Sequence, residues 1–231
     1  MSDTVPAPSA PAAIPGDPAR LHLTVTSEIG APVGRGERQE RHRLNARFLA
    51  EGEDPHQWSA AHDQVGVVAV HRIRLERGAV DVGVLAAVQQ AEVLEAELAE
   101  AVLGSAFTRR GGRSRLVPAV REALGKGPRT DLGDLVLLSH VSVNEPWAGT
   151  GLDVLLLGEL LARIGGPAVV ATAPSFMRGG QDCQSLMASL RTAGFVPLAE
   201  HTIVADAALV PALSGPAGQD LLRRYAAEAV H

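Results

Sequence analysis

Three side chains that can take part in acid–base chemistry lie close together near the middle of the chain: His140, Ser142 and Glu145. His140 is a candidate general base, because the pKa of a free imidazole lies near the pH at which most enzymes operate. Glu145 can act as a base through a water molecule, and Ser142 can donate a hydrogen bond to a substrate. Simpler interpretations remain open: a histidine satisfied inside a sheet, a loop carboxylate in solvent and a packed serine.

An apolar strand and the turn after it must position these side chains. Residues 135–143 form a run rich in aliphatic and β-branched residues, which predicts a strand. Side chains alternate between the two faces of a strand, so Val141 and Val143 are expected on one face. The same alternation places His140 and Ser142 together on the other face.

The turn that follows the strand has the composition of a phosphate-binding site. Gly149 and Gly151 let the backbone approach a ligand closely, and a helix is predicted over 151–164. Free N–H groups and the positive end of the helix dipole would meet at one point, which suits a pyrophosphate. The backbone amides expected to bind it are those of Gly149, Thr150, Gly151, Leu152 and Asp153.

The carboxylate of Asp153 can affect this site in three ways. If it faces the phosphates, two charges about 5 Å apart repel by roughly 3 kcal/mol at an effective dielectric of about 20. That repulsion corresponds to about a hundredfold in affinity. If Asp153 turns outward, it stabilises the helix N-terminus by about 0.3–1 kcal/mol. In the third case, Asp153 and Glu145 hold a divalent cation beside the phosphates.

Composition narrows the class of protein. The chain has 231 residues, 46% of them hydrophobic, which is enough for one large domain. Its net charge of −5 gives no basic footprint for nucleic acid. Neither a long apolar span nor a signal peptide is recognisable, so no membrane association is expected. Cys183 is the only cysteine, which excludes an intrachain disulfide and fits a cytoplasmic protein, and no zinc-type spacing of His and Cys occurs.

The order of the predicted elements favours an α/β fold. Strands are expected over 21–26, 65–75, 80–82, 135–143, 168–173, 195–198 and 201–205. Helices are expected over 36–49, 86–103, 115–124, 151–164, 182–192 and 220–230, with a basic loop over 107–115. Residues 1–19 are rich in Pro and Ala and are expected to form a disordered tail. Residues 20–213 then make one domain, and 214–231 a C-terminal helix.

Residues 135–204 contain strand, glycine turn, helix, strand and a helix that ends at Gly194-Phe195. In this order they resemble the GNAT acyltransferase superfamily. The signature of that family, after its fourth strand, is Arg or Gln, two residues, Gly, one residue, and Gly or Ala. Gly149 and Gly151 fit this stretch, and Leu152 fits its usual aliphatic position.

Three positions depart from the pattern of the family. Ala148 stands where the family has Arg or Gln, and Asp153 stands where it has Gly or Ala. Many members carry a tyrosine, the general acid, four residues before the late glycine, and this chain has Leu190 there. Arg178, in the loop before the last of these helices, is a candidate to meet the phosphates in place of the missing arginine.

The resemblance implies a GNAT-like three-layer fold, in which a mixed, twisted sheet carries helices on both faces. Two central parallel strands would splay apart to admit acetyl-CoA or another acyl-CoA. The strand edge at Val141 and Val143 would then pair with the pantetheine arm, and the N–H near Val143 would stabilise the oxyanion. The implied reaction is direct acyl transfer to an amine of a small molecule or a protein, and a homodimer is expected by analogy.

Two alternatives follow from the three departures. The chain can be a degenerate member of the fold that binds a ligand or a partner without transferring an acyl group. It can also be an enzyme of this fold repurposed for another reaction, for example in specialised metabolism, because a fold does not determine a function.

Overall fold

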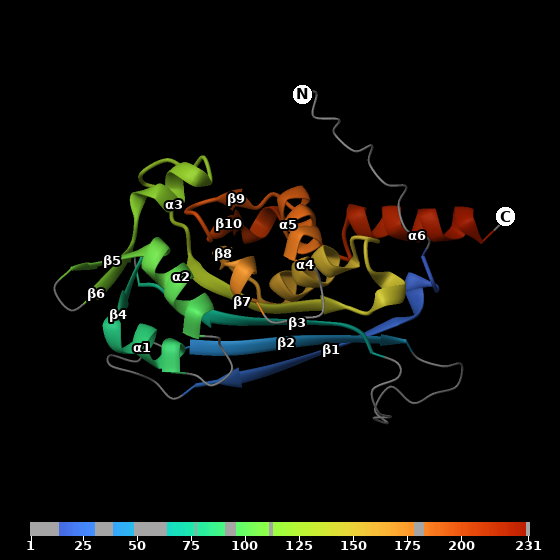
Figure 1. Cartoon of the computed structure of the whole chain (residues 1–231), viewed down its shortest axis with the longest axis horizontal. Coiled ribbons are helices and arrows are strands. Elements are labelled where there is room, and N and C mark those ends of the chain that lie inside the picture. The colour runs from blue at the N-terminus through green and yellow to red at the C-terminus, as the bar shows by residue number, and fades with distance from the viewer. Residues whose placement is uncertain are drawn as a thin grey trace, which may run out of the picture.

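The computed structural model describes residues 14–30, 39–48, 64–76, 78–90, 96–110, 113–177 and 183–229. A seven-stranded sheet runs through it in the order β1-β2-β3-β7-β8-β10-β9 (Figure 1). Its strands are β1 (Leu21–Ile29), β2 (Gln39–Phe48), β3 (Gln64–Ile73), β7 (Asp134–Val143), β8 (Ala168–Thr172), β9 (Val196–Pro197) and β10 (Ile203–Asp206). β7 and β8 are parallel and the other neighbours are antiparallel, so the sheet is mixed.

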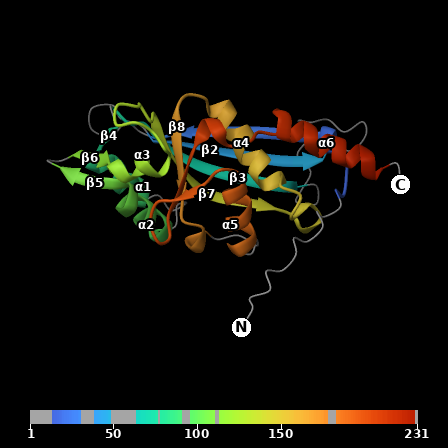
Figure 2. The ribbon, with the colours of Figure 1, turned by 90° about the horizontal axis from the view of Figure 1, so that it is seen from above.

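Helices cover both faces of this sheet. They are α1 (Val82–Gln90), α2 (Ala96–Ala106), α3 (Pro118–Ala123), α4 (Leu152–Ile164), α5 (Cys183–Thr192) and α6 (Pro216–Glu228). Figures 1 and 2 show α4, α5 and α6 on one side of the strands. There Leu156, Leu190 and Leu221 share an apolar core with the sheet. On the other side, α1 and α2 pack against Leu135 and Leu137 of β7. The predicted α/β, three-layer fold is confirmed and is compatible with a GNAT-like architecture.

Two sequence predictions are wrong. The helix expected over 36–49 is the strand β2 within the described residues, because Leu44 and Ala46 alternate with polar residues into the core. The loop expected over 107–115 is a hairpin of β5 (Phe107–Arg110) and β6 (Arg113–Leu116), joined by β4 (Ala79–Asp81) in a small second sheet. The helix expected over 86–103 appears as α1 and α2.

Helix α4 lies between the sheet and a cover formed by residues 211–214. Every residue over 152–161 is buried, so the helix is enclosed on all sides. The N–H of Leu213 donates to the carbonyl of Leu155 (3.2 Å), and the N–H of Ser214 donates to Glu159 Oε2 (3.0 Å). A Cβ atom on Gly158 would lie 2.1 Å from the carbonyl oxygen of Pro211, so only glycine permits this approach.

The segment before β1 packs against the other end of the chain. Its described part begins at Ile14, which is buried and whose N–H donates to Glu228 Oε2 (2.9 Å). Residues 14–19 therefore lie against α6 and belong to the folded unit. In the described part of the chain, no helix is both long and apolar enough to cross a membrane.

Candidate functional site

The central parallel strands separate after a short shared stretch. β7 pairs with β8 only over 134–137, against residues 168–171. The hydroxyl of Thr172, the last residue of β8, donates to the carbonyl of Leu138 (3.0 Å). β7 continues to Val143 and remains paired with β3 on its other side. Among the described residues, the edge of β7 over 139–143 therefore has no strand partner on the side of β8.

A β-bulge at Ser139 determines which side chains face this opening. Ala69 pairs with His140, and the next residue of β3, Val70, pairs with Leu138, so Ser139 is the extra residue. The Ser139 hydroxyl donates to the carbonyl of Ala69 (3.0 Å). Because the bulge shifts the alternation by one, Leu138 and Val141 both lie in the core beneath α4.

His140 and Ser142 lie on the opposite face, as the sequence predicts, and both are half-buried. Nε2 of His140 lies 3.0 Å from Oγ of Ser142, within hydrogen-bond distance. Val143 is buried with Val141 under α4. Glu145 faces solvent in the short turn η2 (Glu145–Trp147). The structure thus brings His140 and Ser142 together, whereas Glu145 lies in the turn that follows β7.

The turn before α4 leaves several amides without a protein acceptor. Gly149 and Gly151 adopt φ angles of 76° and 86°, which favour glycine. The N–H of Thr150 donates to Trp147 O (3.3 Å), and the N–H of Leu152 donates to Thr150 Oγ1 (3.3 Å). Within the described chain, the free amides at the turn are those of Gly149, Gly151, Asp153 and Val154. The amides of Thr150 and Leu152 were predicted to be free and are not, whereas the amide of Val154 is free and was not predicted.

Asp153 takes a position that the sequence does not predict. Asp153 is only 5% exposed, so its carboxylate is not turned to solvent, and it does not line the cavity described below. At the first turn of α4 its carboxylate lies near the positive end of the helix dipole. The described residues contain no group of three or more His, Cys, Asp or Glu side chains arranged to hold a metal ion.

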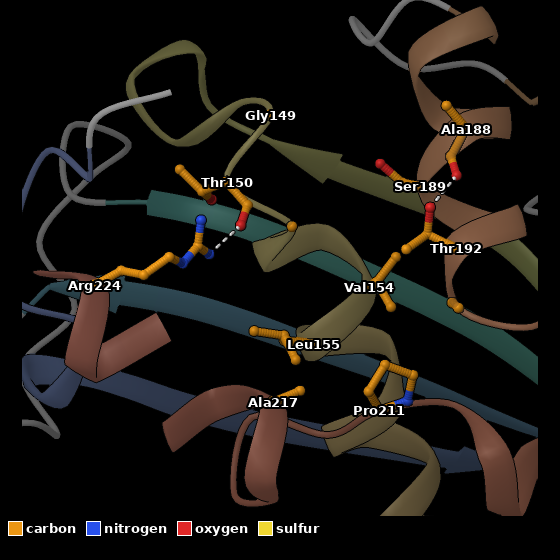
Figure 3. Close-up of a pocket in the computed structure, with 12 residues that line it drawn as sticks. Gly149, Thr150, Val154, Leu155, Ala188, Ser189, Thr192, Pro211, Ala217 and Arg224 are labelled. Atoms are coloured by element: carbon orange, nitrogen blue, oxygen red, sulfur yellow. Dashed lines mark hydrogen bonds between the residues drawn. The ribbon is translucent and has the colours of Figure 1, made fainter. Parts of the chain in front are cut away.

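A cavity of about 400 Å³ opens beside the turn, between α4, α5 and α6 (Figure 3). Its wall includes the turn itself, Val154 and Leu155 of α4, the C-terminal half of α5, Pro211 and Arg224. Nη2 of Arg224 donates to the carbonyl of Thr150 (3.0 Å). A guanidinium therefore stands at the turn where Ala148 supplies no cation. Arg178, which was expected to fill this role, lies outside the described residues.

Sequence reasoning missed Arg224 because it lies 74 residues beyond Thr150. The turn and α6 carry no shared motif that would connect them, so no local signal identifies this contact.

Gly194 ends a helix, as the sequence predicts. Gly194 has a φ of 91° and ends α5, and the N–H of Phe195 donates to the carbonyl of Leu190 (3.0 Å). The side chain of Leu190 is in the core and offers no acid.

No known family model, curated protein or solved structure matches this chain. A functional interpretation therefore depends on the geometry of the open strand edge, the turn and the cavity.

Proposed function

We propose that this protein is an acyl-CoA-dependent N-acyltransferase that transfers an acetyl or another acyl group directly to an amine. The observation that carries the proposal is the continuity between two features. The unpaired edge of β7 leads through η2 into a turn in which the amides of Gly149, Gly151, Asp153 and Val154 have no acceptor among the described residues. A pantetheine arm has amide groups that can pair with such an edge, and a pyrophosphate is a natural ligand for such a turn.

Arg224 supports the phosphate end of this proposal. Its guanidinium uses one N–H group on Thr150 and retains others that can contact a phosphate. The cavity between α4 and α5 begins at the same turn and has room for the part of the ligand beyond the pyrophosphate. A guanidinium brought by α6 offsets the loss of the arginine or glutamine that Ala148 replaces.

His140 is the proposed general base. The nitrogen of the amine would attack the thioester carbonyl and form the new N–C bond, while the C–S bond breaks and CoA leaves as a thiolate. His140 would take the proton from the amine, directly or through Ser142, whose hydroxyl lies 3.0 Å away. The backbone N–H near Val143 would stabilise the oxyanion. Because Leu190 carries no acid, the thiolate would take its proton from solvent.

A second candidate function is ligand or partner binding without acyl transfer. The observation that favours it is the burial of Leu190 in the core, where many members of the resembled family place a catalytic tyrosine. In this case the turn and cavity would bind a phosphate-containing ligand, but no thioester would be consumed.

The experiment that tests the proposal has two stages. Isothermal titration with acetyl-CoA and with free CoA measures binding, and mass spectrometry of a panel of amines incubated with acetyl-CoA detects transfer. We expect micromolar binding and at least one acylated amine. Binding without transfer would favour the second candidate. No binding at millimolar ligand would exclude acyl transfer from CoA and would leave the second candidate only with a ligand other than CoA.

Two glycine variants provide a matched control for that titration. Gly151 and Gly125 both have positive φ, and a Cβ atom on either would meet no atom within 4 Å. Each alanine substitution therefore costs about 1–2 kcal/mol of backbone strain without a clash. Gly151→Ala should weaken CoA binding, because it disturbs the turn, whereas Gly125→Ala at the end of α3 should leave the affinity unchanged.

A further inference from the structure

We propose that the edge strand β1 joins two copies of this chain into a dimer with one continuous sheet. β1 is first in the strand order and pairs with β2 alone among the described strands (Figure 1). It is nine residues long, and its pairing with β2 has no bulge. Edge strands that stay unpaired are commonly short, bulged or protected by Pro or by charged side chains, especially Lys. β1 is neither short nor bulged and contains no Pro or Lys, and its one carboxylate, that of Glu28, pairs with Arg41 of β2 (3.6 Å).

The backbone of β1 presents a regular set of hydrogen-bonding groups on its outer edge. In an antiparallel ladder, every second residue exchanges hydrogen bonds with the neighbouring strand. The N–H of Gly30 donates to the carbonyl of Gln39 (3.0 Å), so Gly30 is one of the residues bonded to β2. Counting back along β1, the even-numbered residues bond to β2. The odd-numbered residues, including the central Val25, point their N–H and C=O groups away from the sheet.

A two-fold axis through Val25 pairs β1 of one copy with β1 of the second copy over its whole length. An axis perpendicular to the sheet keeps the face beneath α4 on the same side in both copies, so opposite residues must lie on the same face of the sheet. The axis at Val25 meets this condition and leaves no residue of β1 without a partner. The resulting pairs are Val25 with Val25, Thr24 with Thr26, Leu23 with Ser27, His22 with Glu28, and Leu21 with Ile29.

The side chains are complementary in this register. Ile29 is 63% exposed in the single chain, and the dimer would place it beside Leu21 of the second copy. On the other face, the imidazole of His22 would meet the carboxylate of Glu28, whose side chain is 75% exposed. A shift of the axis by one residue along β1 would separate Leu21 from Ile29 and His22 from Glu28. The register at Val25 is therefore the one that the strand favours.

Paired charge variants of the full chain test this arrangement and its register. Thr24 and Thr26 are exposed, and each would face the other across the dimer axis. In Thr24→Lys/Thr26→Lys, both cross-strand pairs become Lys–Lys, and in Thr24→Glu/Thr26→Glu they become Glu–Glu. Sedimentation velocity over a concentration series should show a wild-type dimer whose dissociation constant rises at least about tenfold in each variant. An equimolar mixture of the two variants should dimerise again.

The single variant Thr24→Lys is the matched control, because its lysine would face Thr26 and no like charges would meet. Its dissociation constant should stay within about threefold of the wild type. Circular dichroism checks that each variant is folded. The proposal fails if the wild type is monomeric up to its solubility limit. It also fails if the wild-type dimer tolerates both double variants, or if mixing them does not restore association.

Discussion

Arg224 of α6 donates a hydrogen bond of 3.0 Å to the backbone carbonyl of Thr150, in the turn that precedes α4. This contact connects a helix near the C-terminal end to the candidate phosphate site. It orients the guanidinium toward the turn and leaves its remaining N–H groups at the wall of the cavity (Figure 3). The role proposed for Arg224 leads to the first prediction.

Arg224→Ala should weaken the binding of acetyl-CoA by about 10- to 100-fold, since a hydrogen bond to a charged group is worth about 1.5–3 kcal/mol. Titration calorimetry measures the change. Arg223→Ala is the control, because Arg223 is exposed on the same helix and pairs with Asp220 (2.6 Å). Equal affinities for the two variants would remove Arg224 from the binding site.

His140→Gln should lower kcat by about 100- to 10,000-fold and leave the affinity for acetyl-CoA unchanged, if His140 is the base. The acidic limb of the kcat profile against pH should disappear with it. Ser142→Ala removes one hydrogen bond and should lower kcat by about tenfold or less. A variant His140→Gln that keeps the wild-type pH profile would show that another group accepts the proton.

Gly158→Ala should destabilise the protein by about 1–3 kcal/mol, because the added methyl group must displace the cover over α4. The nearest atom, Pro211 O, lies 2.1 Å from the position of that Cβ. Gly104→Ala, in α2, is a matched control, since its Cβ would meet nothing within 4 Å. The control should gain about 0.5–1 kcal/mol from helix propensity. Urea unfolding measures both, and a neutral Gly158→Ala would contradict the tight approach.

Stability should fall in mild acid because of His71. Burial, with smaller contributions from Arg41 and His42, lowers the pKa of His71 from 6.5 to about 4. Between these values the unfolded chain binds a proton that the folded chain does not, so the free energy of unfolding decreases as the pH falls. The loss reaches about 3 kcal/mol near pH 4, at about 1.4 kcal/mol per unit, and is absent above about pH 6.5.

The comparison of His71→Leu with the wild type isolates this effect. Urea unfolding at pH 7 and pH 5 should show a smaller loss of stability for the variant than for the wild type. His42, which also has a lowered pKa, is present in both proteins, so the part of its effect that does not depend on His71 cancels in the comparison. Parallel losses in the two proteins would mean that His71 titrates normally in the folded state.

The elements from β7 to α5 could be predicted from the sequence within a few residues, because each is apolar with a clear period and ends at Gly or Pro. β2 could not be predicted as a strand, because its buried face carries Glu40 and His42. Distant neighbours contact these groups: Arg74 Nε donates to Glu40 Oε1 (2.8 Å), and Ser27 Oγ lies 2.8 Å from His42 Nδ1. Because inner side chains of this strand are polar, its local sequence pattern is typical of a surface helix.

Some features of the candidate site could likewise be predicted from the sequence, and others could not. The faces of His140 and Ser142 follow from simple alternation, and the glycine turn follows from composition. The separation of β7 from β8 depends on where β8 stops pairing, and the Arg224 contact depends on how α6 returns to α4. Both are tertiary features, which the local pattern of residues does not contain.

The extra residue at Ser139 is one that β7 could lose without exchanging its two faces. A deletion of that codon would join Leu138 to His140 in uninterrupted alternation. Leu138 and Val141 would then be two residues apart, so Val141 and Val143 would stay in the core beneath α4, and His140 and Ser142 would stay on the opposite face. The deletion would remove the bulge and the hydrogen bond from Ser139 to Ala69, but it would leave the pairing of Ala69 with His140 in place. The loss of one residue should therefore be tolerated at this position of the central strand.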